Sequence, residues 1–194
     1  MAFSSNGSVA TAVGNSADQT SLAVGSVTAA INDFLVLLIG VDNNQTTDGD
    51  EGAVSGVTDS AGNTWHKAAE FTNGQGAAQA GATCSVWYTK VTAALSSGTV
   101  TAAFTNSSSR DRSGATIWGW AVGSDTVSIE GAPGTLANDG ADPGSLDVTT
   151  ANIECLRVRA IASETTGSGV SLTPTSGWTA FTQSVSSGFL AAIM

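Results

Sequence analysis

The chain of 194 residues is long enough for one domain with a full hydrophobic core, and its charge is strongly one-sided. Six Lys and Arg residues stand against 16 Asp and Glu residues, and the resulting net charge of −10 opposes binding to nucleic acids or anionic membranes. Although 41% of the residues are hydrophobic, only 11% are charged, and no segment combines an apolar helical stripe with charged faces. We therefore expect a single all-β domain over residues 1–194.

The N-terminal segment, residues 1–8, carries no charge and a single aromatic side chain, Phe3. We expect a flexible arm that becomes ordered only when Phe3 docks on a neighbouring subunit. The segment also lacks the basic region and the apolar core of a signal peptide. The longest strongly apolar run, residues 34–41, has eight residues, against the roughly 20 that a membrane-spanning helix needs. The sequence therefore predicts neither a secretion signal nor a membrane span.

Short apolar runs of strand length are separated by clusters of Gly, Asn, Asp and Ser, which is typical of a β-sandwich or β-barrel. Because the run 34–41 is apolar on both faces, we expect a central strand whose second face is covered by a loop, a short helix or another subunit. Alternation places Trp118 and Trp120 on one face of their strand. The predicted strands are 22–27, 34–41, 54–58, 84–91, 99–104, 116–122, 145–148, 155–162, 177–183 and 188–193.

The order of these elements occurs twice along the chain. The sequence SLAV at residues 21–24 returns as SLDV at 145–148, and residues 57–65 are loosely matched by 172–178. We predict a two-sheet antiparallel sandwich built from two similar β halves, each supplying strands to both sheets. The halves are joined through residues 106–144, within which the Pro, Gly, Asn and Asp content of residues 131–144 indicates a long surface loop.

The sharpest local motif is DSAGNTW at residues 59–65. The side chains of Asp59 and Asn63 suit the capping of a tight turn, and Gly62 can adopt a positive φ before Trp65 enters a buried strand. We interpret the motif as a structural turn. The alternative is that Asp59 presents its carboxylate to a ligand.

Oxygen ligands suited to calcium are concentrated in residues 42–51. Their spacing fails the EF-hand template, because the twelfth position from Asp42 is Ala53 rather than Glu. We expect a solvated acidic loop that holds no metal.

A single histidine, His66, rules out metal sites and mechanisms that need two, so we expect it to have a surface or packing role. No serine lies in a strand–elbow–helix context, and no glycine-rich phosphate loop precedes a helix. Cys84 and Cys155 lie in apolar runs, where we expect free thiols rather than a disulfide. The sequence therefore predicts a protein that is not an enzyme and that uses no cofactor.

Arg157 and Arg159 alternate with apolar residues, so two of only four arginines share one face of a predicted strand. This face is either solvated and paired with acidic neighbours or, because Arg is enriched at interfaces, a subunit contact. We take Phe3, Arg157 and Arg159 as the candidate interface residues. The other two, Arg110 and Arg112, are expected at a loop tip or hairpin end.

Residues 34–41, the turn 59–65, the VWY run at 86–88 and the strand 99–104 follow one another in a recognisable order. This order resembles β-sandwich domains of bacteriophage virion proteins and bacterial surface proteins, in which a D-S-A-G-N-T-[WY] turn lies between a buried strand and a V-W-Y strand. The resemblance covers residues 21–122 well and the remainder weakly. It implies a jelly-roll-like or immunoglobulin-like sandwich that serves as a structural or attachment module, with no catalytic residues to carry over.

The resemblance further implies a virion structural protein of a bacteriophage, assembled in the host cytoplasm: a capsid decoration or cement protein that binds the outside of the head shell. Its partner is then the major capsid protein or another virion protein. The alternatives are a tail or fibre component, and a bacterial surface or carbohydrate-binding module. A sugar binder should expose two or three Trp in a plane, whereas we expect most of the five here to be buried. Low charge and the apolar segments 34–41 and 188–194 predict a homo-oligomer. If the protein occupies threefold positions of a capsid, as the resemblance implies, a trimer is favoured over a dimer.

Overall fold

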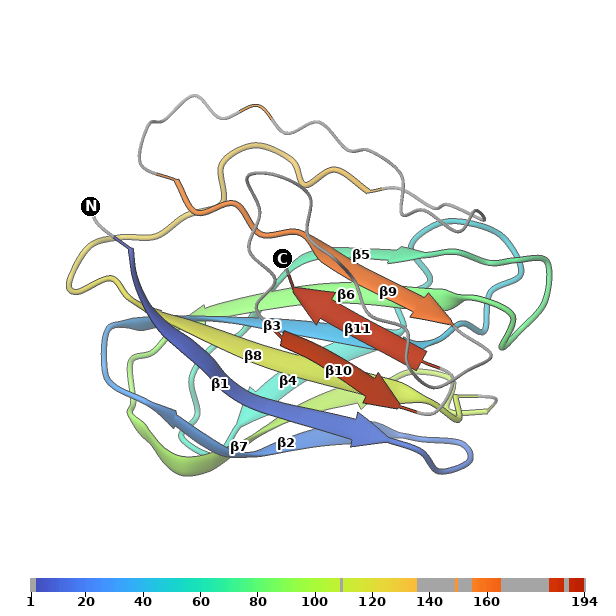
Figure 1. The fold of residues 1–194 in the computed structure, drawn as a ribbon, viewed down its shortest axis with the longest axis horizontal. Coiled ribbons are helices and arrows are strands. Elements are labelled where there is room, and N and C mark those ends of the chain that lie inside the picture. The colour runs from blue at the N-terminus through green and yellow to red at the C-terminus, as the bar shows by residue number, and fades with distance from the viewer. Residues whose placement is uncertain are drawn as a thin grey trace.

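The computed structural model describes residues 3–108, 110–135, 149, 155–164, 182–186 and 189–193, which contain eleven β-strands. Eight of these strands form two antiparallel sheets packed face to face (Figure 1). The five-stranded sheet has the order β1 (Ser4–Gly14), β8 (Ser113–Ala121), β3 (Asp33–Asp42), β6 (Ala82–Lys90) and β5 (His66–Thr72). The three-stranded sheet has the order β2 (Ser21–Ala29), β7 (Leu95–Phe104) and β4 (Val54–Asp59).

Seven of these eight strands are arranged as in a jelly roll. In a jelly roll the first strand lies beside the eighth, the third lies between the eighth and the sixth, and the second and fourth flank the seventh. The orders β1-β8-β3-β6 and β2-β7-β4 follow this scheme. β5 departs from it, because it pairs with β6 at the edge of the larger sheet. The predicted all-β sandwich of two antiparallel sheets is confirmed.

The main core lies between the two sheets. On β3, Leu35, Leu37, Ile39 and Val41 point inward and are fully buried, in a cluster that also holds Trp87 of β6. The intervening residues of β3 belong to two other clusters, on the opposite face of the five-stranded sheet. Alternation along a strand that is apolar throughout therefore requires cover on both sides.

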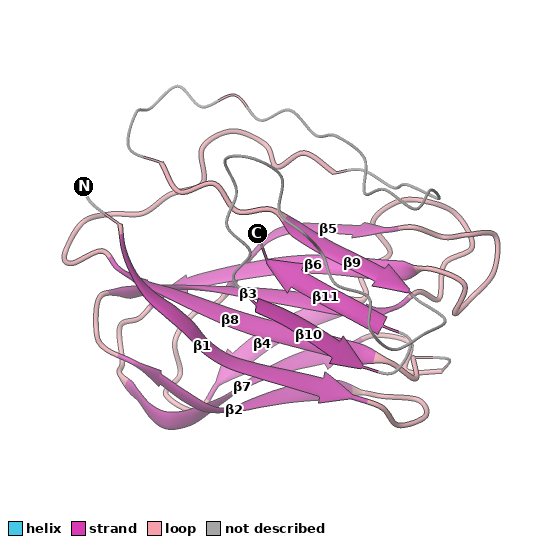
Figure 2. Cartoon of the chain, viewed as in Figure 1, coloured by secondary structure: helices cyan, strands magenta, loops and turns pink. Residues whose placement is uncertain are grey.

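The second face of β3 is covered by the C-terminal part of the same chain. Three strands form a separate sheet with the order β10 (Thr182–Ser186), β11 (Phe189–Ile193) and β9 (Ala160–Glu164). Figure 2 shows this sheet lying over β3, β6 and β8. Leu38 of β3 packs there against the side chains of Val158, Ala160 and Ala162. Within the described residues, this cover is partly the loop that we expected, at Val158, and partly the strand β9, rather than a helix.

The predicted division into two halves that each supply strands to both sheets is wrong for the described residues. All strands of the sandwich come from residues 4–121, whereas the described C-terminal strands form the third sheet. A strand with one buried face shows the same alternation of residues in whichever sheet it packs. The repeated order of elements therefore did not determine which sheet the C-terminal strands would join. The predicted strand 145–148 and residues 177–181 of the predicted strand 177–183 lie outside the described residues.

Two edge strands of the larger sheet are absent from the predicted list of strands, although we expected a strand to follow the turn at residues 59–65, where β5 begins. β1 is rich in Ser, Gly and Ala, and β5 has no continuous apolar run. Ser4 to Ser8, which we expected in a flexible arm, lie in β1, where Ser4 pairs with Ala121 and Ser8 with Trp118. No helix within the described ranges is long and apolar enough to cross a membrane.

A buried ion pair holds together the connections at one end of the sandwich. Arg110 lies in the β7–β8 connection, as predicted, but it is only 1% exposed rather than at a tip. Its Nη1 lies 2.9 Å from Oε1 of Glu51, a residue that precedes β4. The guanidinium also donates to the carbonyl oxygens of Thr105 at 2.8 Å, of Asn106 at 3.1 Å and of Asp42. One side chain thus links the β3–β4 and β7–β8 connections, which are distant in sequence.

Replacing Arg110 with Met should lower the free energy of unfolding by about 3–5 kcal/mol, because Glu51 would remain buried without its cation. Urea unfolding followed by tryptophan fluorescence measures the loss. Arg157, which is exposed, provides the matched control: Arg157→Met should change stability by less than about 0.5 kcal/mol. Equal effects of the two substitutions would contradict the importance of the buried pair.

Candidate functional site

A row of aromatic rings crosses the outer face of the five-stranded sheet, the face that is turned away from β2, β7 and β4. His66 and Tyr88 have ring centroids 5.4 Å apart, and Tyr88 and Phe34 are 5.8 Å apart. Phe34 and Trp120 are 6.5 Å apart, as are Trp120 and Trp118. The row therefore runs from β5 through β6 and β3 to β8.

Strand register explains the order of the rings. His66 of β5 lies directly opposite Tyr88 of β6, and Phe34 of β3 lies opposite Trp120 of β8. Cross-strand neighbours on one face of a sheet are close enough for such rings to touch. Trp118 shares the face of Trp120, as alternation predicted.

We expected most of the five tryptophans to be buried. Of the four that the structure describes, three are buried. Trp65 and Trp87 are each 7% exposed in the main core, and Trp120 is 2% exposed. Trp118 is half-buried, and its Nε1 donates to Ser5 Oγ at 3.0 Å. The rings of Trp118 and Trp120 are tilted by 49°, so these two residues do not form a flat exposed platform.

One end of the aromatic row borders a pocket of about 310 Å³. The pocket lies where β3 begins, at the end opposite to Arg110, and β3, β5, β6 and the segments beside them line it. Its lining residues are Phe34, Thr64, His66, Tyr88, Lys90, Thr92 and Val127. His66 is exposed, and Tyr88 and Lys90 are half-buried. The pocket therefore combines aromatic faces, hydroxyl groups and basic nitrogen atoms.

The sequence analysis did not identify this pocket, although the sequence does indicate that two of its lining residues share one face of a strand. Alternation along the predicted strand 84–91 places Tyr88 and Lys90 on the same face. The pairing of β5 with β6, which adds His66, depends on a contact between distant segments. His66 keeps the surface position that we predicted, in contact with the Tyr88 ring.

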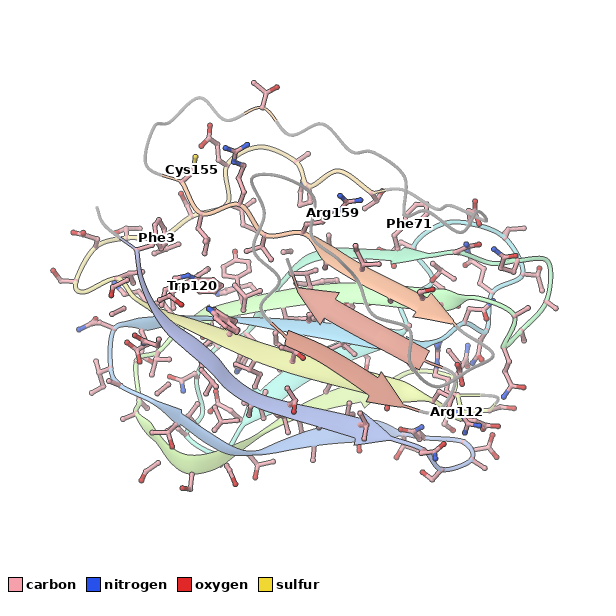
Figure 3. All side chains as sticks on the ribbon, viewed as in Figure 1. Phe3, Phe71, Arg112, Trp120, Cys155 and Arg159 are labelled. Carbon is pink, nitrogen blue, oxygen red and sulfur yellow. The ribbon has the colours of Figure 1, made fainter. Side chains whose placement is uncertain are left out.

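The candidate interface residues lie on two segments that approach one another. Phe3 is half-buried and packs in the cluster of Phe34 and Trp120, to which Leu156 also contributes (Figure 3). Phe3 thus docks on its own chain rather than standing free.

The predicted alternation of residues 155–162 is present, although β9 begins only at Ala160. Leu156 and Val158 pack inward on the aromatic cluster. Arg157 is exposed and Arg159 is half-buried. Arg157 therefore lies on the surface, while its neighbours Leu156 and Val158 cover the outer face of the five-stranded sheet.

The turn at residues 59–65 has the structural role that we predicted. Asp59 Oδ1 accepts hydrogen bonds from the backbone N–H groups of Ala61 at 2.9 Å and Asn63 at 3.1 Å. Asp59 Oδ2 accepts one from Trp65 Nε1 at 2.8 Å, and Gly62 has a φ of 82°. The carboxylate is thus used to close the turn and to anchor Trp65.

Partial burial alone would raise the pKa of Asp59, but the hydrogen bonds from Trp65, Asn63 and Ala61 outweigh it and lower that pKa. A carboxylate with a lowered pKa stabilises the fold above its unfolded pKa and loses that contribution as the pH falls through its folded pKa. Asp59→Ala should therefore cost about 1–3 kcal/mol at pH 7 and less at pH 3. Thermal unfolding of both proteins across this pH range measures the difference, and a cost independent of pH would contradict the argument.

In the acidic loop at residues 42–51, carboxylate groups also accept hydrogen bonds from within the protein. Glu51 Oε2 accepts the backbone N–H groups of Asn44 at 3.1 Å and Gln45 at 2.8 Å, and Glu51 Oε1 accepts the hydroxyl of Thr83 at 2.6 Å. Asp42 is buried, and desolvation raises its pKa despite hydrogen bonds from Arg112 and other backbone donors. In the part of the chain that the structure describes, no three His, Cys, Asp or Glu residues form a metal-binding group.

Cys84 and Cys155 are free thiols, as predicted, and both are half-buried. Cys84 packs beneath Ala160 and Ala162 of the third sheet. Its burial, with a smaller effect of Glu70, raises the pKa of its thiol to about 12.

Because the thiolate is the reactive form, Cys84 should resist iodoacetamide at pH 8 in the native protein. Mass spectrometry should find this cysteine unmodified without denaturant and alkylated in urea. Rapid native labelling of Cys84 would show that the third sheet does not protect it.

Comparison of the chain with family models, with curated proteins and with solved structures gives no match. The functional argument therefore depends on the fold and on the surface chemistry described above.

Proposed function

We propose that this protein is a structural component of a bacteriophage virion, a capsid decoration or cement protein that binds the outside of the head shell. Its partner is the major capsid protein or another virion protein, and it acts as a homo-oligomer, with a trimer preferred. Jelly rolls recur in viral capsid and lectin domains, so the fold supports the proposal by analogy. The specific support comes from one edge of the sandwich.

That edge is β1, an uncharged strand. β1 pairs with β8 and is the last strand on its side of the five-stranded sheet. Natural edge strands are commonly protected by charges, by proline or by bulges. The bulges of β1 lie before Ala10, and the stretch from Ala10 to Gly14 is regular and has neither a charge nor a proline. This stretch is suited to contact with another subunit or with the shell.

Two side chains of this stretch point away from the core and allow a direct test. Thr11 and Val13 are exposed, and Val13 keeps 52% of its surface accessible. The double variant Thr11→Lys with Val13→Lys places two charges on exposed positions of β1 without filling or emptying the core. It should reduce binding to undecorated head shells at least about tenfold, because buried charges at an interface without partners are costly.

The measurement is co-sedimentation of purified protein with shells that lack the decoration protein, from the phage that encodes this chain. Ile31→Lys is the matched control, since Ile31 is 57% exposed in the β2–β3 connection. It should leave binding unchanged. Failure of the unmodified protein to bind shells would overturn the proposed function, and full binding by the double variant would overturn the role of the β1 edge.

A further inference from the structure

We infer that the pocket beside Tyr88 binds a single sugar ring that carries a carboxylate, a hexuronate in chemical class. This inference does not rest on the proposed attachment to a head shell. It follows from the ring faces, the charge and the hydroxyl groups that line the pocket.

The first argument is the aromatic wall. Tyr88 is half-buried between Phe34 and His66, with centroid distances of 5.8 Å and 5.4 Å. These contacts hold the phenol ring in place before any ligand arrives. A fixed aromatic ring beside an open pocket offers an apolar surface to the C–H face of a pyranose, and pre-organisation lowers the entropic cost of binding.

The second argument is charge. The chain has a net charge of −10, yet no Asp or Glu lines the pocket, whereas Lys90 does. Lys90 Nζ donates to the carbonyl oxygen of Asp125, which fixes the ammonium group at the pocket. An ammonium group has three donors, so others can still point to a ligand. The pocket therefore favours an anion over a neutral molecule.

The third argument is the set of hydroxyl groups. Thr64, Thr92 and Tyr88 each bring one to the lining. The Thr92 hydroxyl donates to Asn63 Oδ1 at 3.2 Å, so its oxygen remains able to accept a hydrogen bond. Such groups match the ring hydroxyls of a sugar and give no advantage to a purely apolar acid.

Size agrees with one ring. A volume of about 310 Å³ lies at the lower end of the roughly 300–1,000 Å³ that is typical of small-molecule sites. A free monosaccharide or the terminal residue of a chain would fit, and a longer oligosaccharide would extend outside the pocket.

The composition of the protein supplies a direct reporter. His66 is the only histidine and Tyr88 the only tyrosine, and both line the pocket. Their ring signals in an NMR spectrum are therefore assigned without further work. Titration with methyl glucuronide should shift both sets of signals in a saturable manner.

Two comparison ligands separate the contributions. Methyl glucoside has the same ring without the carboxylate and should bind at least about tenfold more weakly. Acetate has the carboxylate without the ring and should leave the Tyr88 signals in place. Equal binding of the glucoside or of acetate would overturn the assignment to an acidic sugar, and no response to the glucuronide would overturn the site.

Lys90→Gln should weaken glucuronide binding about tenfold while leaving binding of the glucoside unchanged. Lys67→Gln is the matched control, since Lys67 is the only other lysine and pairs with Glu70 at 3.3 Å, away from the pocket lining. It should bind the glucuronide normally. His66→Ala alters an exposed residue, so it should fold and should also bind more weakly; normal binding by both Lys90→Gln and His66→Ala would refute the inference.

Discussion

The structure depends most on the burial of β3 on both of its faces. Phe34, Leu35, Val36, Leu37, Leu38 and Ile39 are all nearly inaccessible to solvent, which requires one packed layer on each side. The sheet β2-β7-β4 provides the first layer through the main core, and residues 155–164 contribute to the second. A two-layer sandwich would have left half of this apolar surface in water, so the C-terminal strands complete the hydrophobic burial that the sandwich begins.

Polar interactions organise the two ends of the same strand in different ways. At the end of β3, the carbonyl oxygen of Asp42 accepts from the buried Arg110, which also holds Glu51, so the connections there are fixed by charged groups without solvent. At the start of β3, Phe34 joins an aromatic row that stays partly open at His66 and Tyr88. One end is thus closed and internally satisfied, whereas the other leaves donors and ring faces near solvent.

The features that sequence could predict are those that local periodicity encodes. The apolar runs 22–27, 34–41 and 99–104 lie within β2, β3 and β7, and the turn at Asp59 forms the hydrogen bonds that its residues suit. The edge strand β1 was missed, and the extent of β5 beyond the turn was not predicted, because partly exposed strands need few apolar residues. The burial of Arg110 and the pairing that brings His66 to Tyr88 were also missed, because both arise from contacts between segments distant in the chain.

The pairing of β1 with β8 also determines when the larger sheet can close during synthesis. Gly14 pairs with Ser113, and at about 5–20 residues per second a ribosome needs roughly 5–20 s to make the chain between them. β1 therefore leaves the ribosome long before its partner exists. Its Ser, Gly and Ala content makes it a poor template for association with other nascent chains during that interval. The low content of apolar residues, which prevented the prediction of this strand, thus also reduces its association with other chains before β8 has been synthesised.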